Sequence, residues 1–229
     1  MSTGKIVFEE IRQIDKISAL LLDQKELHVW KLNLTNFPDN ASGYLDTKEL
    51  QRYQRIIPEQ QKNRFLASRY WLRQILSDYL NCPLHELQFT SGEKGKPALI
   101  TPGIKLEFNL THTGDYAALA IAIDTQVGID IESIRGKINT VKIARQLFSV
   151  NEIEQLEALP TQQQSNYFFE CWTRMEARQK CMGLGIFNEK VADEQVVTKS
   201  WELDENLLLS VAWSDREWQP LVRFLEPGV

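Results

Sequence analysis

The sequence predicts a protein of mixed α+β class, built as two halves of similar design. The expected elements run strand, helices, strands and then strand, helices, strands, an α+β pattern repeated about twice at a scale near 100 residues. The chain has 229 residues, enough for one large domain or two small ones and for a substantial core. We expect an N-terminal half over 1–123, a C-terminal half over 124–229 and a ligand cleft between them.

In the first half, residues 1–24 are expected to form a loosely attached leader, with room for a short helix. Apolar and polar residues alternate over 28–34, which predicts a half-buried strand. Pro58 opens a long helix with apolar residues at helical period, and its other face carries Arg64, Arg69 and Arg73. Three strands are then expected, at 87–90, 104–108 and 116–123.

The second half begins with an expected strand over 127–132. A helix at about 139–148 precedes another from Ser149, which with Glu152 fits an S-x-x-E capping box. The longest helix should run from about residue 161 to residue 182 and end at Gly183, because glycine commonly terminates helices. Three closing antiparallel strands are expected at 201–203, 207–213 and 221–225.

Composition restricts the class of partner. The net charge of −5 and the pI near 5.4 argue against a general nucleic-acid or polybasic membrane binder, so a polyanion must bind at a local basic site. The three cysteines form no C-x-x-C pair and indicate reduced thiols. No apolar run reaches about 18 residues, and the N-terminus is unlike a secretory signal. We expect a cytoplasmic monomer that binds neither nucleic acid nor membrane.

The segment V-G-I-D-I-E over 127–132 carries two carboxylates, Asp130 and Glu132, on the same face of an expected strand. Neighbouring carboxylates repel unless a cation lies between them, and oxygen ligands at this spacing suit Mg²⁺. The alternative is an exposed edge with two solvated acids.

A second motif, W-T-R-M-E-A-R-Q-K over 172–180, lies on the expected long helix. Trp172, Glu176 and Lys180 fall along one face at i, i+4 and i+8. One interpretation is a third carboxylate for the metal and a lysine for a phosphate. The other is a surface Glu–Lys pair beside a tryptophan of the core.

The polar cluster F-N-L-T-H over 108–112 follows an expected strand, so we place Asn109, Thr111 and His112 at a strand end or turn. His112 and the Thr111 hydroxyl could hold a phosphate. The alternative is a structural histidine, partly buried and hydrogen-bonded.

A basic turn, Lys94, Gly95, Lys96 and Pro97, combines a close backbone approach with positive charge. Arg52, Arg55 and Arg64 could extend it into a basic strip. An ordinary basic turn and solvated helix faces explain the same residues equally well.

The order and spacing of the four motifs resemble those of surfactin-type phosphopantetheinyl transferases, and the last motif resembles the W-[ST]-x-K-E-A-x-x-K subgroup. The resemblance covers roughly residues 45–190. It implies a pseudo-two-fold pair of α+β subdomains, each a three-stranded antiparallel sheet with a long helix, with coenzyme A between them. It also implies transfer of 4'-phosphopantetheine from coenzyme A to a serine of an acyl or peptidyl carrier protein of fatty-acid, polyketide or peptide synthesis.

The resemblance further assigns roles to individual residues. The Mg²⁺ ligands are Asp130, Glu132 and Glu176, and Mn²⁺ suits the same oxygens; the catalytic residues are Glu176, Lys180 and Asp130. Glu176 is the expected base, and Lys180 contacts the pyrophosphate. The expected coenzyme A contacts are Arg52, Arg64, Lys94, Gly95, Lys96, Pro97, Asn109, Thr111, His112 and Lys180.

The chain departs from the subgroup at Met175, where the pattern has lysine. We expect a lysine there to reach the edge of the cleft; the alternative is that Met175 packs in an apolar contact. A coenzyme A-binding protein that has lost transfer activity is a second functional hypothesis. A two-carboxylate Mg²⁺ phosphodiesterase or nuclease is a third, disfavoured by the acidic pI.

Overall fold

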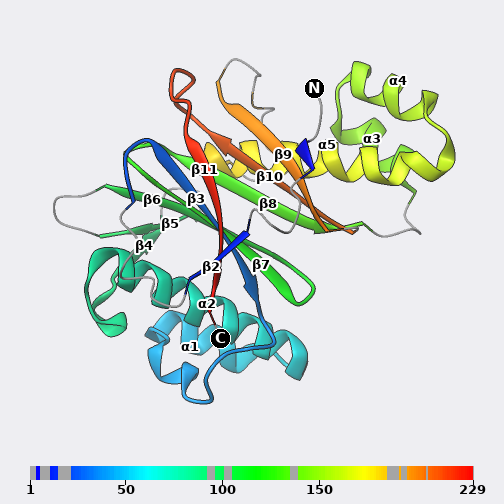
Figure 1. Cartoon of the computed structure of the whole chain (residues 1–229). Coiled ribbons are helices and arrows are strands. Elements are labelled where there is room, and N and C mark those ends of the chain that lie inside the picture. Colours follow the sequence, from blue (N-terminus) through cyan, green and yellow to red (C-terminus); the bar gives the residue numbers. More distant parts are fainter. Residues whose placement is uncertain are drawn as a thin grey trace.

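The computed structural model describes residues 4–5, 11–14, 22–91, 96–100, 105–134, 139–184, 191, 195–204 and 206–228. Two β-sheets pack face to face between two sets of helices (Figure 1). Helices α1 (Thr47–Arg55) and α2 (Glu59–Leu80) lie on the outer side of one sheet. Helix α5 (Thr161–Cys181) lies on the outer side of the other, with α3 (Thr140–Leu147) and α4 (Val150–Ala158) beside it.

Within the described residues, the sheet next to α2 has five strands in the order β2-β11-β3-β7-β6. Strands β3, β7 and β6 are antiparallel neighbours, whereas β11 runs parallel to both β3 and β2. The bounds are Ile11–Ile14 for β2, Leu221–Pro227 for β11, Glu26–Asn33 for β3, Tyr116–Ile123 for β7 and Leu106–Thr113 for β6. A separate hairpin joins β4 (Phe89–Ser91) to β5 (Pro97–Leu99), and short 3₁₀ turns lie at Ala41–Tyr44 and Leu84–Glu86.

The sheet next to α5 has four strands in the part of the chain that the structure describes, in the order β1-β9-β10-β8. Strand β10 (Leu207–Trp213) lies between β9 (Val197–Asp204) and β8 (Val127–Ser133) and is antiparallel to both. The two-residue strand β1 (Gly4–Lys5) adds to β9 in parallel. Strand β8 is thus an edge strand of this sheet, as β6 is of the other.

Alternation along the strands divides the core into layers. In β7, Ala117, Leu119 and Ile121 pack toward α2, while Ala118, Ala120 and Ala122 pack toward the second sheet. The odd residues of β8, Val127, Ile129 and Ile131, fill the same inter-sheet layer. Gly128, Asp130 and Glu132 consequently point to the other side of β8, because successive strand side chains face opposite ways.

The α+β class and most expected elements are confirmed. Helix α4 begins with the expected capping box of Ser149 and Glu152, and α5 ends just before Gly183, which has φ +65°. The strand over 28–34 differs from expectation: His28, Val29 and Trp30 are all buried, because β3 lies inside a sheet that is covered on both faces. Among the described residues, no helix is long and apolar enough to cross a membrane.

Three expectations were wrong. Neither main sheet is the expected three-stranded antiparallel sheet. Each contains three antiparallel strands, but in the described residues β1 adds in parallel to one sheet, and β11 and β2 add in parallel to the other. The expected leader contributes two short strands, β1 and β2, in its described part. The last strand closes its sheet in parallel, since β11 pairs with β3 and β2 rather than with an antiparallel neighbour.

Candidate active site

Strand β8 and helix α5 bring together the residues of two of the sequence motifs. The Nζ of Lys180 lies 2.5 Å from Oδ1 of Asp130 and 3.2 Å from Oε2 of Glu176. Asp130 is 2% exposed and Glu176 is 7% exposed. The expected Glu176–Lys180 pair is therefore present, but it faces the carboxylate of β8 instead of solvent.

Strand β6 completes this group from the other sheet. Thr111 donates its hydroxyl to Oδ1 of Asp130 at 3.0 Å and accepts from Nζ of Lys180 at 3.2 Å. Asn109 accepts from the backbone N–H of Ile129 at 2.9 Å through Oδ1. Thr113 donates to Oε2 of Glu132 at 3.2 Å. Asn109, Thr111 and Thr113 share one face of β6. We expected the cluster at a strand end or turn, and it lies within the second half of this strand, which continues to Thr113.

Gly128 lets α5 approach β8 closely. A Cβ atom at this position would lie 2.1 Å from the carbonyl oxygen of Ala177 and 2.2 Å from the backbone nitrogen of Cys181. Any larger residue must therefore push the helix backbone away from the strand. Because Glu176 and Lys180 flank these contacts in the helix, Gly128 sets how near they come to Asp130.

The charges in this group affect one another strongly. Burial raises the pKa of Asp130 to about 7; the Glu176 and Glu132 carboxylates add to the rise, and the Lys180 ammonium opposes it. Burial alone would lower the pKa of Lys180, but the carboxylates of Asp130 and Glu176 outweigh it and raise that pKa. Lys180 is thus held as a cation between two acidic side chains.

The donor set is chemically suited to a hard divalent cation. The Oδ2 atom of Asp130 is buried and has no hydrogen-bond partner in the described part of the chain, which leaves an unsatisfied acceptor on that carboxylate. Carboxylate oxygens are the ligands that Mg²⁺ prefers. In this structure Lys180 supplies the positive charge, and no three His, Cys, Asp or Glu side chains of the described residues already converge as a metal site. These residues fit a divalent cation, because they supply carboxylate oxygens and because Oδ2 of Asp130 has no hydrogen-bond partner among the described residues.

A basic region lies beside this group, on the opposite face of β6. The pKa of His112 is lowered, first by loss of hydration and then by the positive charges of Lys180, Arg69, Arg52 and Arg64. The side chains of Arg52 and Arg69 both lie against the ring of Phe65, at 5.3 and 5.5 Å from its centre. A neutral imidazole among four cations is an environment that favours an anion.

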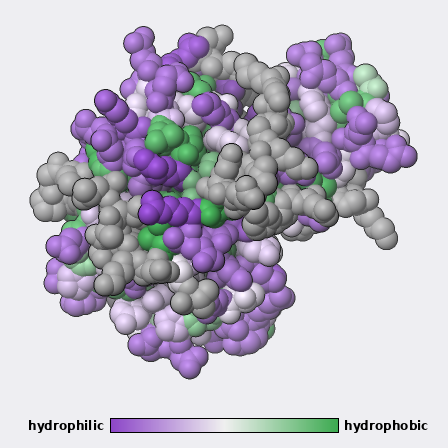
Figure 2. All heavy atoms as spheres, in the orientation of Figure 1, coloured by the Kyte–Doolittle hydropathy of each residue, from purple (hydrophilic) through white to green (hydrophobic). Residues whose placement is uncertain are grey.

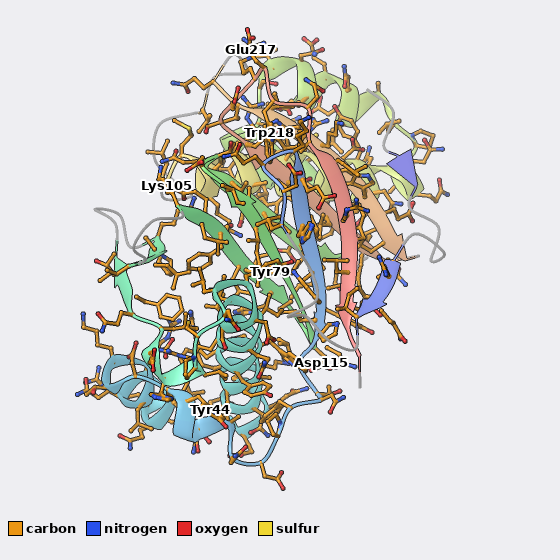
Figure 3. All side chains as sticks on the ribbon, turned by 60° about the vertical axis from the view of Figure 1, so that its left-hand side comes forward. Tyr44, Tyr79, Lys105, Asp115, Glu217 and Trp218 are labelled. Carbon is orange, nitrogen blue, oxygen red and sulfur yellow. The ribbon has the colours of Figure 1, made fainter. Side chains whose placement is uncertain are left out.

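Two further expected coenzyme A contacts, Arg64 and Lys96, also have protein partners in this structure. Arg64 donates from Nε to Oδ1 of Asp115 at 2.8 Å. Asp115 lies in the turn after β6, whereas Lys105 precedes the other end of this strand; both are labelled in Figure 3. Lys96 is half-buried and donates to the carbonyl oxygens of Val127 at 2.8 Å and Cys181 at 3.4 Å. Pro97 begins β5. Lys94 and Gly95 lie outside the described residues.

Comparison with known proteins identifies the family. Residues 126–218 match a family described as the 4'-phosphopantetheinyl transferase superfamily, and residues 29–124 match the family described as 4'-phosphopantetheinyl transferase, N-terminal. The 4'-phosphopantetheinyl transferase HetI of Nostoc sp. is 31% identical over 227 residues, which cover 90% of this chain and 95% of HetI. The chain belongs to the 4'-phosphopantetheinyl transferase family.

Two further members of this family are also similar to the chain. AcpT of Escherichia coli is 40% identical over 122 residues, which cover 53% of this chain and 58% of AcpT. The transferase gsp of Aneurinibacillus migulanus is 29% identical over 186 residues, which cover 81% of this chain and 72% of gsp. The phosphopantetheinyl transferase family expected from the four motifs is thereby confirmed, while the subgroup assignment remains a prediction.

Met175, where this transferase departs from the subgroup motif, lies in an apolar contact. It packs against the cluster formed by α3, α4 and α5, and the same cluster includes Trp172, whose ring stacks on Phe168 at 5.9 Å. The expectation that position 175 borders the cleft is therefore not supported. Trp172 fits the interpretation as a core residue beside the Glu–Lys pair.

Sequence reasoning missed two residues of the region. Thr113 was overlooked because the motif was expected at a turn; the period-2 spacing of residues 109, 111 and 113 was the available signal. Arg69 was noted only as part of a polar helix face. Burial lowers its pKa, and its Nε has no hydrogen-bond partner within the described residues, although Oε1 of Glu49 lies 3.8 Å away. No sequence signal separates Arg69 from its neighbours.

Proposed function

We propose that this member of the family transfers the 4'-phosphopantetheine group of coenzyme A to a serine of an acyl or peptidyl carrier protein and releases 3',5'-ADP. The observation that carries the proposal is the buried group of Asp130, Glu176, Lys180 and Thr111, built by both sheets and α5. Burying charged groups with an unsatisfied carboxylate oxygen lowers the stability of the fold, and such groups are typical of ligand-binding and catalytic sites.

Binding of coenzyme A is assigned to the basic region. Arg52, Arg64 and Arg69 are near enough to His112 to lower its pKa, so phosphate groups would be drawn to this part of the surface, and Thr111 adds a hydroxyl on the other face of the strand. Phosphates carry several acceptor oxygens and are well matched by guanidinium donors. Arg64 would exchange Asp115 for the ligand, because a surface ion pair of this kind is weak.

The reaction requires the serine oxygen of the carrier to form a bond to the phosphorus next to pantetheine. The bond from that phosphorus to the oxygen of the departing 3',5'-ADP breaks, and ADP keeps the electron pair. Lys180 is the group proposed to neutralise the charge that gathers on the pyrophosphate oxygens. Glu176, 7% exposed and beside Lys180, is the proposed acceptor of the serine proton.

Asp130, Glu132 and Glu176 would hold a divalent cation, Mg²⁺ or Mn²⁺, in this site. When bound, the cation supplies further positive charge to the pyrophosphate. Lys180 would contact the same pyrophosphate as the cation, because its ammonium lies beside two of the three carboxylates.

The test is to incubate the protein with coenzyme A, Mg²⁺ and an unmodified carrier protein, and to measure the carrier mass. A gain of one phosphopantetheine group on the wild-type carrier, absent when its acceptor serine is changed to alanine, supports the proposal. Binding of coenzyme A without any mass gain, across fatty-acid, polyketide and peptide carriers, would instead favour a protein that has lost transfer. Hydrolysis of coenzyme A without a carrier product would indicate a phosphodiesterase.

A further inference from the structure

A chain of hydroxyl groups joins the four-stranded sheet to α5 beneath the site. The Oγ of Ser200 on β9 lies 2.8 Å from Oγ of Ser210 on β10, and Oγ of Ser210 lies 2.8 Å from Oγ1 of Thr173 on α5. Thr173 donates in turn to the carbonyl oxygen of Glu170 in its own helix at 3.2 Å. Thr173 and Ser210 are both 0% exposed.

The direction of these hydrogen bonds follows from the proton count. Each hydroxyl has one proton to donate. Since Thr173 uses its proton on the Glu170 carbonyl, Ser210 must be the donor to Thr173, and Ser200 the donor to Ser210. The chain therefore runs one way, from β9 through β10 to the backbone of α5, and every proton in it has an acceptor.

The hydroxyl chain lies directly next to the site. Ser210 is the cross-strand partner of Asp130 on one side and of Ser200 on the other, so all three lie in one row across the sheet and face α5. On α5, Thr173 is followed by Glu176 three residues later and Lys180 seven residues later, which places the three on one helix face. Thr173 therefore contacts the row at Ser210, and Lys180 contacts it at Asp130.

Close to the site, the contacts between α5 and the sheet are made by small residues. Gly128, Ala177 and Ala212 meet there, whereas the bulky Leu208 of β10 packs with Phe168 and Phe169 at an earlier turn of α5. The small residues set how closely α5 approaches the sheet, but apolar contacts are not directional, so they restrain sliding and rotation of the helix less than hydrogen bonds do. Hydrogen bonds between buried hydroxyls are directional, and a displaced helix would leave buried polar groups unpaired.

We propose that the Ser200–Ser210–Thr173 hydroxyl chain is a positioning device, which fixes α5 on β10 so that Glu176 and Lys180 stay opposite Asp130. The inference rests on the proposed function for its effect on rate. Small displacements of reacting groups slow enzymes by about 100-fold. The hydroxyl chain acts through the placement of Glu176 and Lys180, without touching the substrate.

The decisive variant is the double change Thr173→Val with Ser210→Ala. Each single change leaves a buried hydroxyl without its partner and should lower the melting temperature. The double change removes both partners of the buried Ser210–Thr173 bond, and Ser200, which is only partly buried, can donate to water instead of Ser210. Because removing both partners is close to neutral for stability, the melting temperature should return to within about 4 °C of the wild type. If the hydroxyl chain positions α5, kcat stays about 10- to 100-fold low in the double variant, while KM for coenzyme A changes less than about threefold.

Two control variants accompany the double variant. Thr173→Ser keeps the hydroxyl and should keep the wild-type kcat. Ser77→Ala removes a buried hydroxyl in α2 that bonds only the Cys82 carbonyl among the contacts described, and it should leave kcat unchanged. A double variant with wild-type kcat overturns the inference, since the hydroxyls would then serve stability alone.

A second readout does not depend on activity. Amine labelling with acetic anhydride, mapped by mass spectrometry, reports how well Lys180 is protected by Asp130 and Glu176, with exposed Lys142 as the internal reference. Lys180 should react at least about threefold faster in the double variant, because a loosened ion pair frees the amine. If the wild type shows no transfer activity but Lys180 loses its protection in the double variant, the proposed function fails and the positioning inference stands. Unchanged protection of Lys180 overturns the positioning inference.

Discussion

At the scale of single residues, Asp130 is a buried acceptor as well as an expected metal ligand. It accepts hydrogen bonds from Lys180 and Thr111 through Oδ1 and is 2% exposed. Asp130→Ala would lower stability, because alanine would leave the partly buried ammonium of Lys180 with one carboxylate fewer.

Asp130→Asn is therefore the better test of chemistry. It keeps the size of the side chain and an acceptor oxygen but removes the charge, and we expect transfer to fall by about 10²- to 10³-fold. The rate of carrier modification at saturating Mg²⁺ measures this, with thermal denaturation as the check on folding. Near wild-type turnover in Asp130→Asn would remove this residue from the metal and catalytic assignments.

Met175→Lys should destabilise the protein without making it faster. The side chain packs against the apolar cluster of α3, α4 and α5, where an ammonium loses hydration, and we expect a loss of about 1–3 kcal/mol in the free energy of unfolding. Urea denaturation measures the loss, and Met175→Leu serves as the apolar control. A faster enzyme of unchanged stability would place this position at the cleft after all.

The sequence predicted part of the site and not its arrangement. Strand alternation puts Asp130 and Glu132 on one face, and helical spacing pairs Glu176 with Lys180; both are local properties. Whether Lys180 faces a phosphate or Asp130 depends on how β8 and α5 dock. That docking depends on Gly128, whose contact with Ala177 lies across two elements.

At the scale of elements, the packing of α5 on β8 is the feature on which the site depends most. Gly128→Ala would set a Cβ 2.1 Å from the Ala177 carbonyl, so the helix must shift outward. We expect the melting temperature to fall by at least about 4 °C and transfer to fall with it. Gly43→Ala is the matched control, because a Cβ there has nothing within 4 Å. Equal melting temperatures in calorimetry and equal transfer rates in the carrier assay for Gly128→Ala and Gly43→Ala would contradict a close contact between β8 and α5.

Elements with strong local signals were predicted well, and strand partners were not. The capping box at Ser149 and the glycine after α5 mark helix ends through local hydrogen bonding and backbone freedom. The parallel pairing of β11 with β3 is a contact between residues far apart in sequence, and alternation within 221–227 does not specify it. Local propensity also could not show that Asn109 and Thr111 lie inside a strand, because polar residues commonly end strands.

At the scale of the whole molecule, a buried polar chain ties α2 to the five-stranded sheet. Trp30 donates to the Tyr79 hydroxyl at 3.1 Å, which donates to Nδ1 of His28 at 2.5 Å. Nε2 of His28 donates to Glu26 at 3.0 Å, and Glu26 also pairs with Arg223 of β11. Figure 3 labels Tyr79 where α2 meets this sheet. His28 and Trp30 are both 0% exposed, in contrast to the described surface of α3 and α4, where polar residues predominate in Figure 2.

His28 should make stability depend on pH. Burial lowers its pKa below the usual 6.5, despite the nearby Glu26 carboxylate, so the unfolded chain binds the proton more readily than the folded one. Its contribution is fully present above pH 6.5 and is lost as the pH falls through its lowered pKa. As the pH falls through this window, the free energy of unfolding of the wild type should decrease by up to about 1.4 kcal/mol per pH unit more than that of His28→Gln. Urea unfolding of both proteins from pH 5 to pH 7.5 measures the difference, and parallel curves would exclude this role.

The position of β11 has a consequence for synthesis on the ribosome. Strand β3 ends at residue 33, but the neighbour on its outer edge is not made until residues 221–227. At ordinary rates of translation this interval is roughly 10–40 s, during which the edge of β3 stays open to wrong partners. Protection of β3 from protease in arrested nascent chains should therefore rise only after β11 has left the exit tunnel; early protection would show that the first sheet closes without it.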